Sequence, residues 1–175
     1  AATNFTFRAQ QVDGFTAGVS FASGFLNMTN AVVRRPEGDA TVDALGFDTR
    51  TKRLYLTNAV GRLEPTAVAK AIGPKTARSL EAYQFLEPPL ARVNGWVQTG
   101  PGRNPAELHF EIDGGAFRFS KFNSRDIDGE IFWRGQTVTL TNIVAEFYGG
   151  ELHGNLVSRF NDDRSADLAF HLETK

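Results

Sequence analysis

The chain has 175 residues, a net charge of −1 at pH 7 and a sequence pI near 6.4. This length suits one domain with a core of its own, and the balanced charge without a concentrated basic face argues against nucleic-acid binding. Cysteine is absent, which excludes a disulfide framework, a thiolate zinc site and a cysteine nucleophile.

The composition favours a sheet. The chain has 15 phenylalanines and 17 glycines but a single methionine, a balance typical of pleated strands and not of helix bundles. It begins at Ala1 without a signal peptide, ends at Lys175 in a strand-like pattern and has no apolar stretch of about 18 residues that could span a bilayer. We therefore expect one β-rich domain over residues 1–175, a fragment of a longer protein whose membrane anchor would lie elsewhere.

The first segment alternates apolar and polar residues. Period two places one apolar face on each strand. A hairpin centred on Asp13, with Gly14 in its loop, would put Phe7 opposite Val19 and Phe5 opposite Phe21. The apolar residues of the second arm are Phe15, Ala17, Val19 and Phe21.

The middle of the chain predicts further strands and one helical insertion. Glu64–Gly73 and Pro74–Tyr83 are alanine-rich with helical spacing, and each has a proline near its start. We expect two short helices within residues 64–83. The predicted strands are Gly24–Val33, Ala40–Phe47, Arg53–Leu63, Ala91–Gln98, Asp126–Arg134 and Thr137–Phe147.

Two more hairpins follow from residue parity. Asp113-Gly114 is a preferred type I′ pair, and a turn there would place Phe110 opposite Phe117 and Leu108 opposite Phe119. Near the C-terminus, a loop centred on Asp162 would pair three apolar residues of one arm with three of the other. The pairs are Leu152 with Leu172, Gly154 with Phe170, and Leu156 with Leu168.

A five-residue string recurs along the chain. Met28-Thr29-Asn30-Ala31-Val32 is followed by similar strings at residues 56–60 and 140–144, with offsets of 28 and 84 residues. Such a period suits an array of hairpins. Recurrent Thr-Asn could equally mark similar bends in separate strands.

The last third of the chain resembles a known family. Asp128-Gly129-Glu130-Ile131 and the run Val138–Leu156, which contains Phe147-Tyr148-Gly149-Gly150 and Gly154, resemble the C-terminal signature of the AsmA-like family. The segments before them, Tyr83-Gln84-Phe85, Pro88-Pro89 and Asn94-Gly95-Trp96, resemble the stretch that often precedes it. The similarity covers residues 80–175, with the AsmA-like sheet itself at 91–175, and rests mainly on the placement of glycines and aromatic residues.

The resemblance implies a location and a function. AsmA-like proteins, with their TamB-like and YhdP-like relatives, are envelope proteins of Gram-negative bacteria whose long periplasmic sheet curls into an apolar groove thought to conduct phospholipid. We therefore expect a non-catalytic periplasmic domain, without a cofactor, that binds or channels phospholipid or another acyl-chain ligand. The groove candidates are Leu108, Phe110, Ile112, Phe117, Phe119, Val138, Leu140, Leu152, Leu156, Leu168, Phe170 and Leu172.

The same apolar face leaves two architectures open. A large antiparallel sheet with an unbroken apolar face needs a cover, and two short helices would cover only part of it. Either the sheet packs on itself as a flattened sandwich, or it curls into an open groove or taco with a strip of Phe, Leu and Val free for acyl chains.

Few residues indicate other chemistry. The chain has no nucleophile elbow, phosphate-binding loop or zinc-protease motif. His153 and His171 would lie opposite each other on the outward face of the C-terminal hairpin, with Glu151 and Glu173 as the next pair. Such a set at the end of two strands is more typical of a solvated polar surface than of a zinc site. Asp126-Ile127-Asp128-Gly129 has Gly135 where a calcium loop needs glutamate, so it indicates a turn or a strand entry.

Aromatic residues support one alternative function. If Trp96, Trp133 and Tyr148 share an exposed face, they could stack on sugar rings, and the domain would then be a carbohydrate-binding or adhesion β-sandwich. Half-buried strands more often use such residues as core or rim.

Overall fold

The protein is mainly β, and its structure is a computed structural model that describes residues 1–7, 10–81, 83–99, 105–119, 122–147, 149–161 and 165–174. Those residues form thirteen strands and two short helices. The elements are β1 (Ala2–Phe7), β2 (Gln10–Ala22), β3 (Phe25–Arg35), β4 (Gly38–Asp48), β5 (Arg53–Arg62), α1 (Pro65–Ile72), α2 (Pro74–Ser79), β6 (Tyr83–Phe85), β7 (Leu90–Gln98), β8 (Ala106–Asp113), β9 (Phe117–Phe119), β10 (Phe122–Arg134), β11 (Thr137–Phe147), β12 (Gly150–Phe160) and β13 (Ala166–Thr174).

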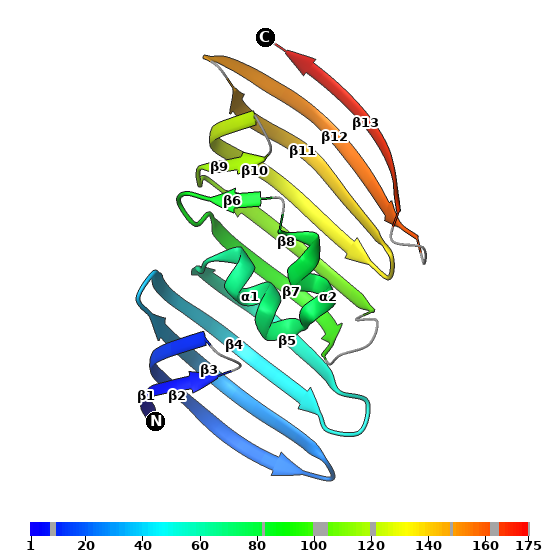
Figure 1. The fold of residues 1–175 in the computed structure, drawn as a ribbon. Coiled ribbons are helices and arrows are strands. Elements are labelled where there is room, and N and C mark those ends of the chain that lie inside the picture. Colours follow the sequence, from blue (N-terminus) through cyan, green and yellow to red (C-terminus); the bar gives the residue numbers. More distant parts are fainter. Residues whose placement is uncertain are drawn as a thin grey trace.

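All strands belong to one open antiparallel sheet. Its order is β1-β2-β3-β4-β5-β7-β8-β10-β11-β12-β13, so neighbours in the sheet follow one another along the chain. The short strands β6 and β9 pair with each other, and β9 also pairs with the start of β10. Figure 1 shows the sheet curving around the helix pair, with β1 and β13 at opposite ends. The expected large curled sheet is confirmed, and it is a single layer.

The helical insertion forms where proline and alanine predicted it. Pro65 starts α1, where the carboxylate of Glu64 caps the helix by accepting hydrogen bonds from the backbone N–H groups of Thr66 and Ala67 at 3.0 and 2.7 Å. The helix ends at Gly73, whose N–H donates to the carbonyl of Ala69. The pair lies in front of β5, β7 and β8 in Figure 1 and covers the middle of one face of the sheet.

The core lies between this insertion and the sheet. Val97, Ala106 and Leu108 form a buried cluster, and Ile72 of α1 packs against it. Because cross-strand partners project from the same side of a sheet, the side of Leu108 can be followed from strand to strand. We call it the helix-side face and its reverse the outer face.

The first hairpin was predicted to turn at Asp13-Gly14, and this prediction is wrong. Phe5 pairs with Val12 and Phe7 with Gln10, and not with Phe21 and Val19, so β2 already begins at Gln10, before Asp13. Asp13 and Gly14 continue β2, because Gly14 pairs with Arg34 of β3. As a thirteen-residue strand, β2 satisfies more backbone N–H and C=O groups by pairing than a shorter strand that began after Gly14 would.

The Asp113-Gly114 hairpin is also wrong. Gly114 and Gly115 take left-handed φ values of 72° and 95°, but the chain bends there without reversing. Both β8 and β9 pair along β10, so Leu108 lies opposite Trp133 and Phe110 opposite Ile131. The antiparallel partner of β9 is the start of β10, where Phe117 lies opposite Ser124.

The C-terminal hairpin forms with a shifted register. Leu156 pairs with Phe170, Gly154 with Leu172 and Asn155 with His171, two residues away from the predicted partners. A shift of two residues preserves the faces, so the apolar residues of both strands still share one side. The loop at 162–164 lies outside the described residues.

The recurrent Thr-Asn string marks strand bends. Asn30, Asn58 and Asn142 all have left-handed φ values, between 49° and 54°, and each lies where the pairing to a neighbouring strand is offset. Asn4 repeats the conformation in β1 with φ of 51°. Such bulges increase local bending. The recurrent string therefore marks a bulge that these strands share, as expected if Thr-Asn marks similar bends in separate strands.

Candidate functional site

The helix-side face carries an apolar surface across the whole sheet. From Leu108 the register leads through Trp133 and Val138 to Ser158 and Leu168, and a second row leads through Phe110, Ile131 and Leu140 to Leu156 and Phe170. The groove candidates whose side chains are described lie on this face. The side chain of Phe119 lies outside the description.

The middle of this face is core and is not free for a ligand. Val97 is 0% exposed and Leu108 4%, and Phe110 and Trp133 pack against them. The prediction that Leu108 lines an open groove is therefore wrong, because the helical insertion covers that part of the sheet. Sequence alternation identified the face but could not show where α1 and α2 would lie.

The two ends of the same face are bare. At the β13 end, Leu168, Phe170 and Leu172 are 61%, 67% and 45% exposed, and at the β2 end Val19 and Phe21 are 63% and 64% exposed. Val19 pairs with Met28 and Phe21 with Leu26, and the register continues from these pairs to the core side of β5 and β7. Both bare strips therefore belong to the helix-side face.

Val19 and Phe21 are absent from the predicted groove. Their alternation places them on the helix-side face, as it does Phe170. The sequence does not reveal, however, that β2 lies near one end of the sheet. The available signal was the position of these residues near the start of a meander, where a strand has fewer neighbours.

An aromatic cluster lies at the bent end of the central strands. Tyr83 stacks on Phe85 and tilts toward Phe117, and Phe117 meets Phe147 edge-on, each pair with ring centroids 6.2 Å apart. Burial raises the pKa of the Tyr83 hydroxyl above its ordinary value. Because Phe117 of β9 contacts Tyr83 of β6 and Phe147 of β11, this cluster joins β6, β9 and β11 where the sheet curls.

The outer face carries polar side chains that are hydrogen-bonded to one another. The side chain of Asn58 donates to Asp43 at 2.8 Å, and Arg92 donates to Asn58. Further along the sheet, His109 contacts the carboxylate of Glu130 at 2.9 Å. Such pairing is typical of a solvated surface.

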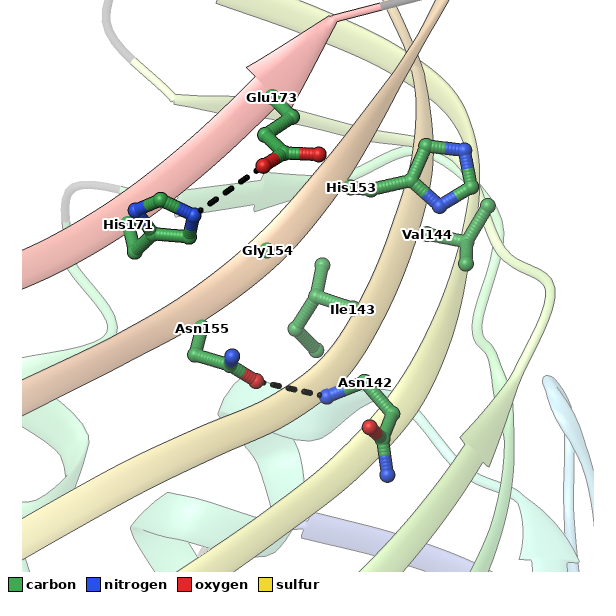
Figure 2. A pocket seen from close by; sticks show the side chains of 8 residues that line it. All are labelled: Asn142, Ile143, Val144, His153, Gly154, Asn155, His171 and Glu173. Carbon is green, nitrogen blue, oxygen red and sulfur yellow. Dashed lines mark hydrogen bonds and ion pairs between the residues drawn. The ribbon is translucent and has the colours of Figure 1, made fainter.

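The predicted histidine cluster takes a different form. His153 lies opposite Glu173 and not opposite His171, because of the two-residue shift. His153 pairs with Glu151, and His171 contacts Glu173 at 3.3 Å. Figure 2 shows His153, His171 and Glu173 among the residues that line a hollow of about 380 Å³ between β11, β12 and β13. Within the described part of the chain, no three His, Cys, Asp or Glu side chains gather as metal ligands would.

The tryptophans do not form a joint platform. Trp96 pairs with Glu107 and Trp133 with Leu108, and because Glu107 and Leu108 are successive residues of β8, the two indoles lie on opposite faces. The guanidinium of Arg53 lies 4.2 Å from the ring centroid of Trp96, and Trp133 donates to the carbonyl of Gly135. Tyr148 lies outside the described residues.

The glycines of the family-like string have structural roles. Gly149 takes a left-handed φ of 83° at the turn between β11 and β12. Gly154 faces β13 so closely that an added Cβ would overlap the carbonyl oxygen of His171. The run Val138–Leu156 is thus one hairpin with a bulge at Asn142.

No family model, no curated protein and no solved structure matches the chain. Among the described residues, the structure has no helix that is long and apolar enough to cross a membrane.

Proposed function

We propose that this domain binds lipid acyl chains on the helix-side face of its sheet and acts without catalysis in phospholipid handling at the envelope of a Gram-negative bacterium. The observation that carries the proposal is the pair of bare apolar strips, at β2 and β13, on the face whose middle is core. Exposed clusters of large apolar side chains are typical of sites for apolar ligands or partners.

The strips have the chemistry of an acyl-chain site. Leu168, Phe170 and Leu172 project from one side of β13, and no residue of that strand is buried. Each methylene of an acyl chain that leaves water for such a surface contributes about 0.8 kcal/mol. A chain of ordinary length could therefore bind without a polar anchor.

The curl of the sheet favours a groove over a flat binding surface. Left-handed asparagines bend β1, β3, β5 and β11, and the helix pair occupies the hollow of the curve. A concave apolar face shields a bound chain from water on more than one side. The periplasmic location and the AsmA-like assignment rest on the resemblance of residues 80–175.

Two neighbouring residues of β13 give a matched test. Phe170 lies on the helix-side face and His171 on the outer face, and both are exposed. The freshly purified protein is analysed by native mass spectrometry for phospholipid and then titrated, after delipidation, with the fluorescent fatty acid cis-parinaric acid. We expect Phe170→Ser to weaken binding about tenfold, because about 1.5 kcal/mol of apolar burial is lost.

The control separates a ligand site from general surface adhesion. His171→Ser should bind the probe as the parent protein does. Equal losses in both variants, or no saturable binding and no co-purified lipid, would rule out an acyl-chain site on this face. Saturable glycan binding in the absence of lipid would favour the carbohydrate-binding function.

A further inference from the structure

Both ends of the sheet have long strand edges without a partner. Among the described residues, β13 pairs with β12 alone, over nine residues. At the other end, β1 covers β2 from Gln10 to Phe15, and the rest of β2, from Thr16 to Ala22, pairs with β3 alone. Each edge therefore presents a row of backbone N–H and C=O groups that another strand can pair with.

These edges lack several of the features that prevent strand addition. Natural edge strands are protected by charged side chains, above all lysine, by proline or by very short length. β13 is nine residues long and contains no lysine or proline, and neither residue occurs in the free part of β2. Both edges also expose large apolar side chains on the helix-side face, at Val19, Phe21, Leu168, Phe170 and Leu172.

The direction of the strands allows one copy to follow another. Strand direction alternates along the sheet, and β2 and β13 are second and eleventh in its main path. In two copies with the same orientation, β13 of one would run antiparallel to β2 of the next. A register with Phe21 opposite Leu168 and Val19 opposite Phe170 keeps these exposed large apolar side chains together on the helix-side face.

The charges favour contact between unlike edges. β13 carries Asp167 and Glu173, whereas the free part of β2 carries no charged residue. Pairing of β13 with its own copy would bring carboxylates together in several registers, and like charges directly opposite each other are destabilising. Contact between unlike edges has no such pair. It also gives both free edges a partner strand, whereas a symmetric dimer leaves one of them unpaired.

We propose that copies of this chain associate head to tail, with β13 of one adding to the free edge of β2 of the next, so that the curled sheet and its apolar face continue across the junction. This contact is heterologous, so it forms chains or rings and not closed dimers. The inference goes beyond lipid binding, because it rests on backbone edges and strand direction and needs no bound lipid.

The absence of cysteine makes a direct test possible. In the proposed register Ser20 of one copy lies opposite Ala169 of the next on the outer face. The delipidated single variants Ser20→Cys and Ala169→Cys and the double variant are treated with a short bis-maleimide cross-linker, which tolerates small shifts in register. We expect a ladder of multiples from the double variant, and a cross-linked heterodimer from the mixed single variants that exceeds the product of either alone.

A further substitution tests the contact itself. Phe170→Lys in the double variant should abolish the ladder, because it places a cation at the junction, while circular dichroism shows that the sheet is retained. Cross-linked dimers of each single variant alone, with no excess of heterodimer, would overturn the proposal in favour of like-edge contacts. A monomer without cross-links at every concentration tested would overturn it as well, and neither result bears on lipid binding.

Discussion

The side-chain oxygen of Asn94 in β7 accepts a hydrogen bond from the backbone N–H of Asn58 in β5 at 2.7 Å. Asn58 lies in a bulge with φ of 49°, where the pairing between β5 and β7 is offset. Asn155 gives the same support to the N–H of Asn142 in the bulge of β11, at 3.0 Å (Figure 2). A side chain from the neighbouring strand thus replaces a backbone partner that the bulge removes.

Removing the acceptor should destabilise the sheet. We expect Asn94→Ala to lower the free energy of unfolding by about 1 kcal/mol, because the N–H of Asn58 loses its partner. Asn94→Asp keeps an oxygen at this position and should retain most of the stability. Urea unfolding followed by circular dichroism measures both, and equal losses would show that the hydrogen bond is not what matters.

The left-handed conformation of Asn30 predicts a second pair of results. Asn30→Val should cost about 1–2 kcal/mol, because a β-branched residue is strained at a φ near 50°. Asn30→Gly should be nearly neutral, since glycine adopts this conformation freely. Thermal unfolding of both variants tests the bulge, and a valine variant as stable as the parent would contradict it.

Gly154 should tolerate no side chain. A methyl group there would overlap the carbonyl oxygen of His171 and press on Leu172, so Gly154→Ala should cost about 2 kcal/mol and loosen β13. Gly14→Ala is the matched control, because its Cβ would lie 3.7 Å from Arg34, in ordinary contact. Hydrogen exchange of residues 166–174 reports the loosening, and unchanged protection in the Gly154 variant would disprove the close approach.

Two residues with the same local pattern should differ in their effect on stability. Leu108→Ala should lose about 2–5 kcal/mol, because it opens a cavity in the core under α1. Phe170→Ser should change the free energy of unfolding by no more than about 0.5 kcal/mol, since its ring is exposed. Chemical denaturation of both variants checks this difference. A large loss at Phe170 would mean that it is structural and not a ligand contact.

Much of the secondary structure could be predicted from the sequence. The helices in 64–83 follow from proline starts and alanine content, and Thr137–Phe147 matches its strand to the residue. Local turn signals failed where the sheet overrode them. Gly14 lies within a strand that is paired on both sides, which holds the chain extended where an isolated Asp-Gly would favour reversal. Asp113-Gly114 marks a bend without a reversal, and Asp128-Gly129 lies at a bulge within β10.

The candidate site could be predicted only in part. Alternation placed Leu108 and Leu168 on one face, yet Leu108 is 4% exposed and Leu168 61%. The difference depends on neighbours that are distant in sequence, since α1 covers the middle of the sheet and no described element lies beyond β13. Period two identifies a face, whereas exposure is decided by what packs on that face.

The most direct test of lipid binding is photolabelling with a fatty acid that carries a diazirine group, followed by mapping of the modified residues by mass spectrometry. The proposed function predicts labels at Leu168, Phe170 and Leu172 on β13 and at Val19 and Phe21 on β2, suppressed by excess phospholipid. Labels at Asp167, Ala169 and His171, or labels spread evenly over both faces, would contradict it.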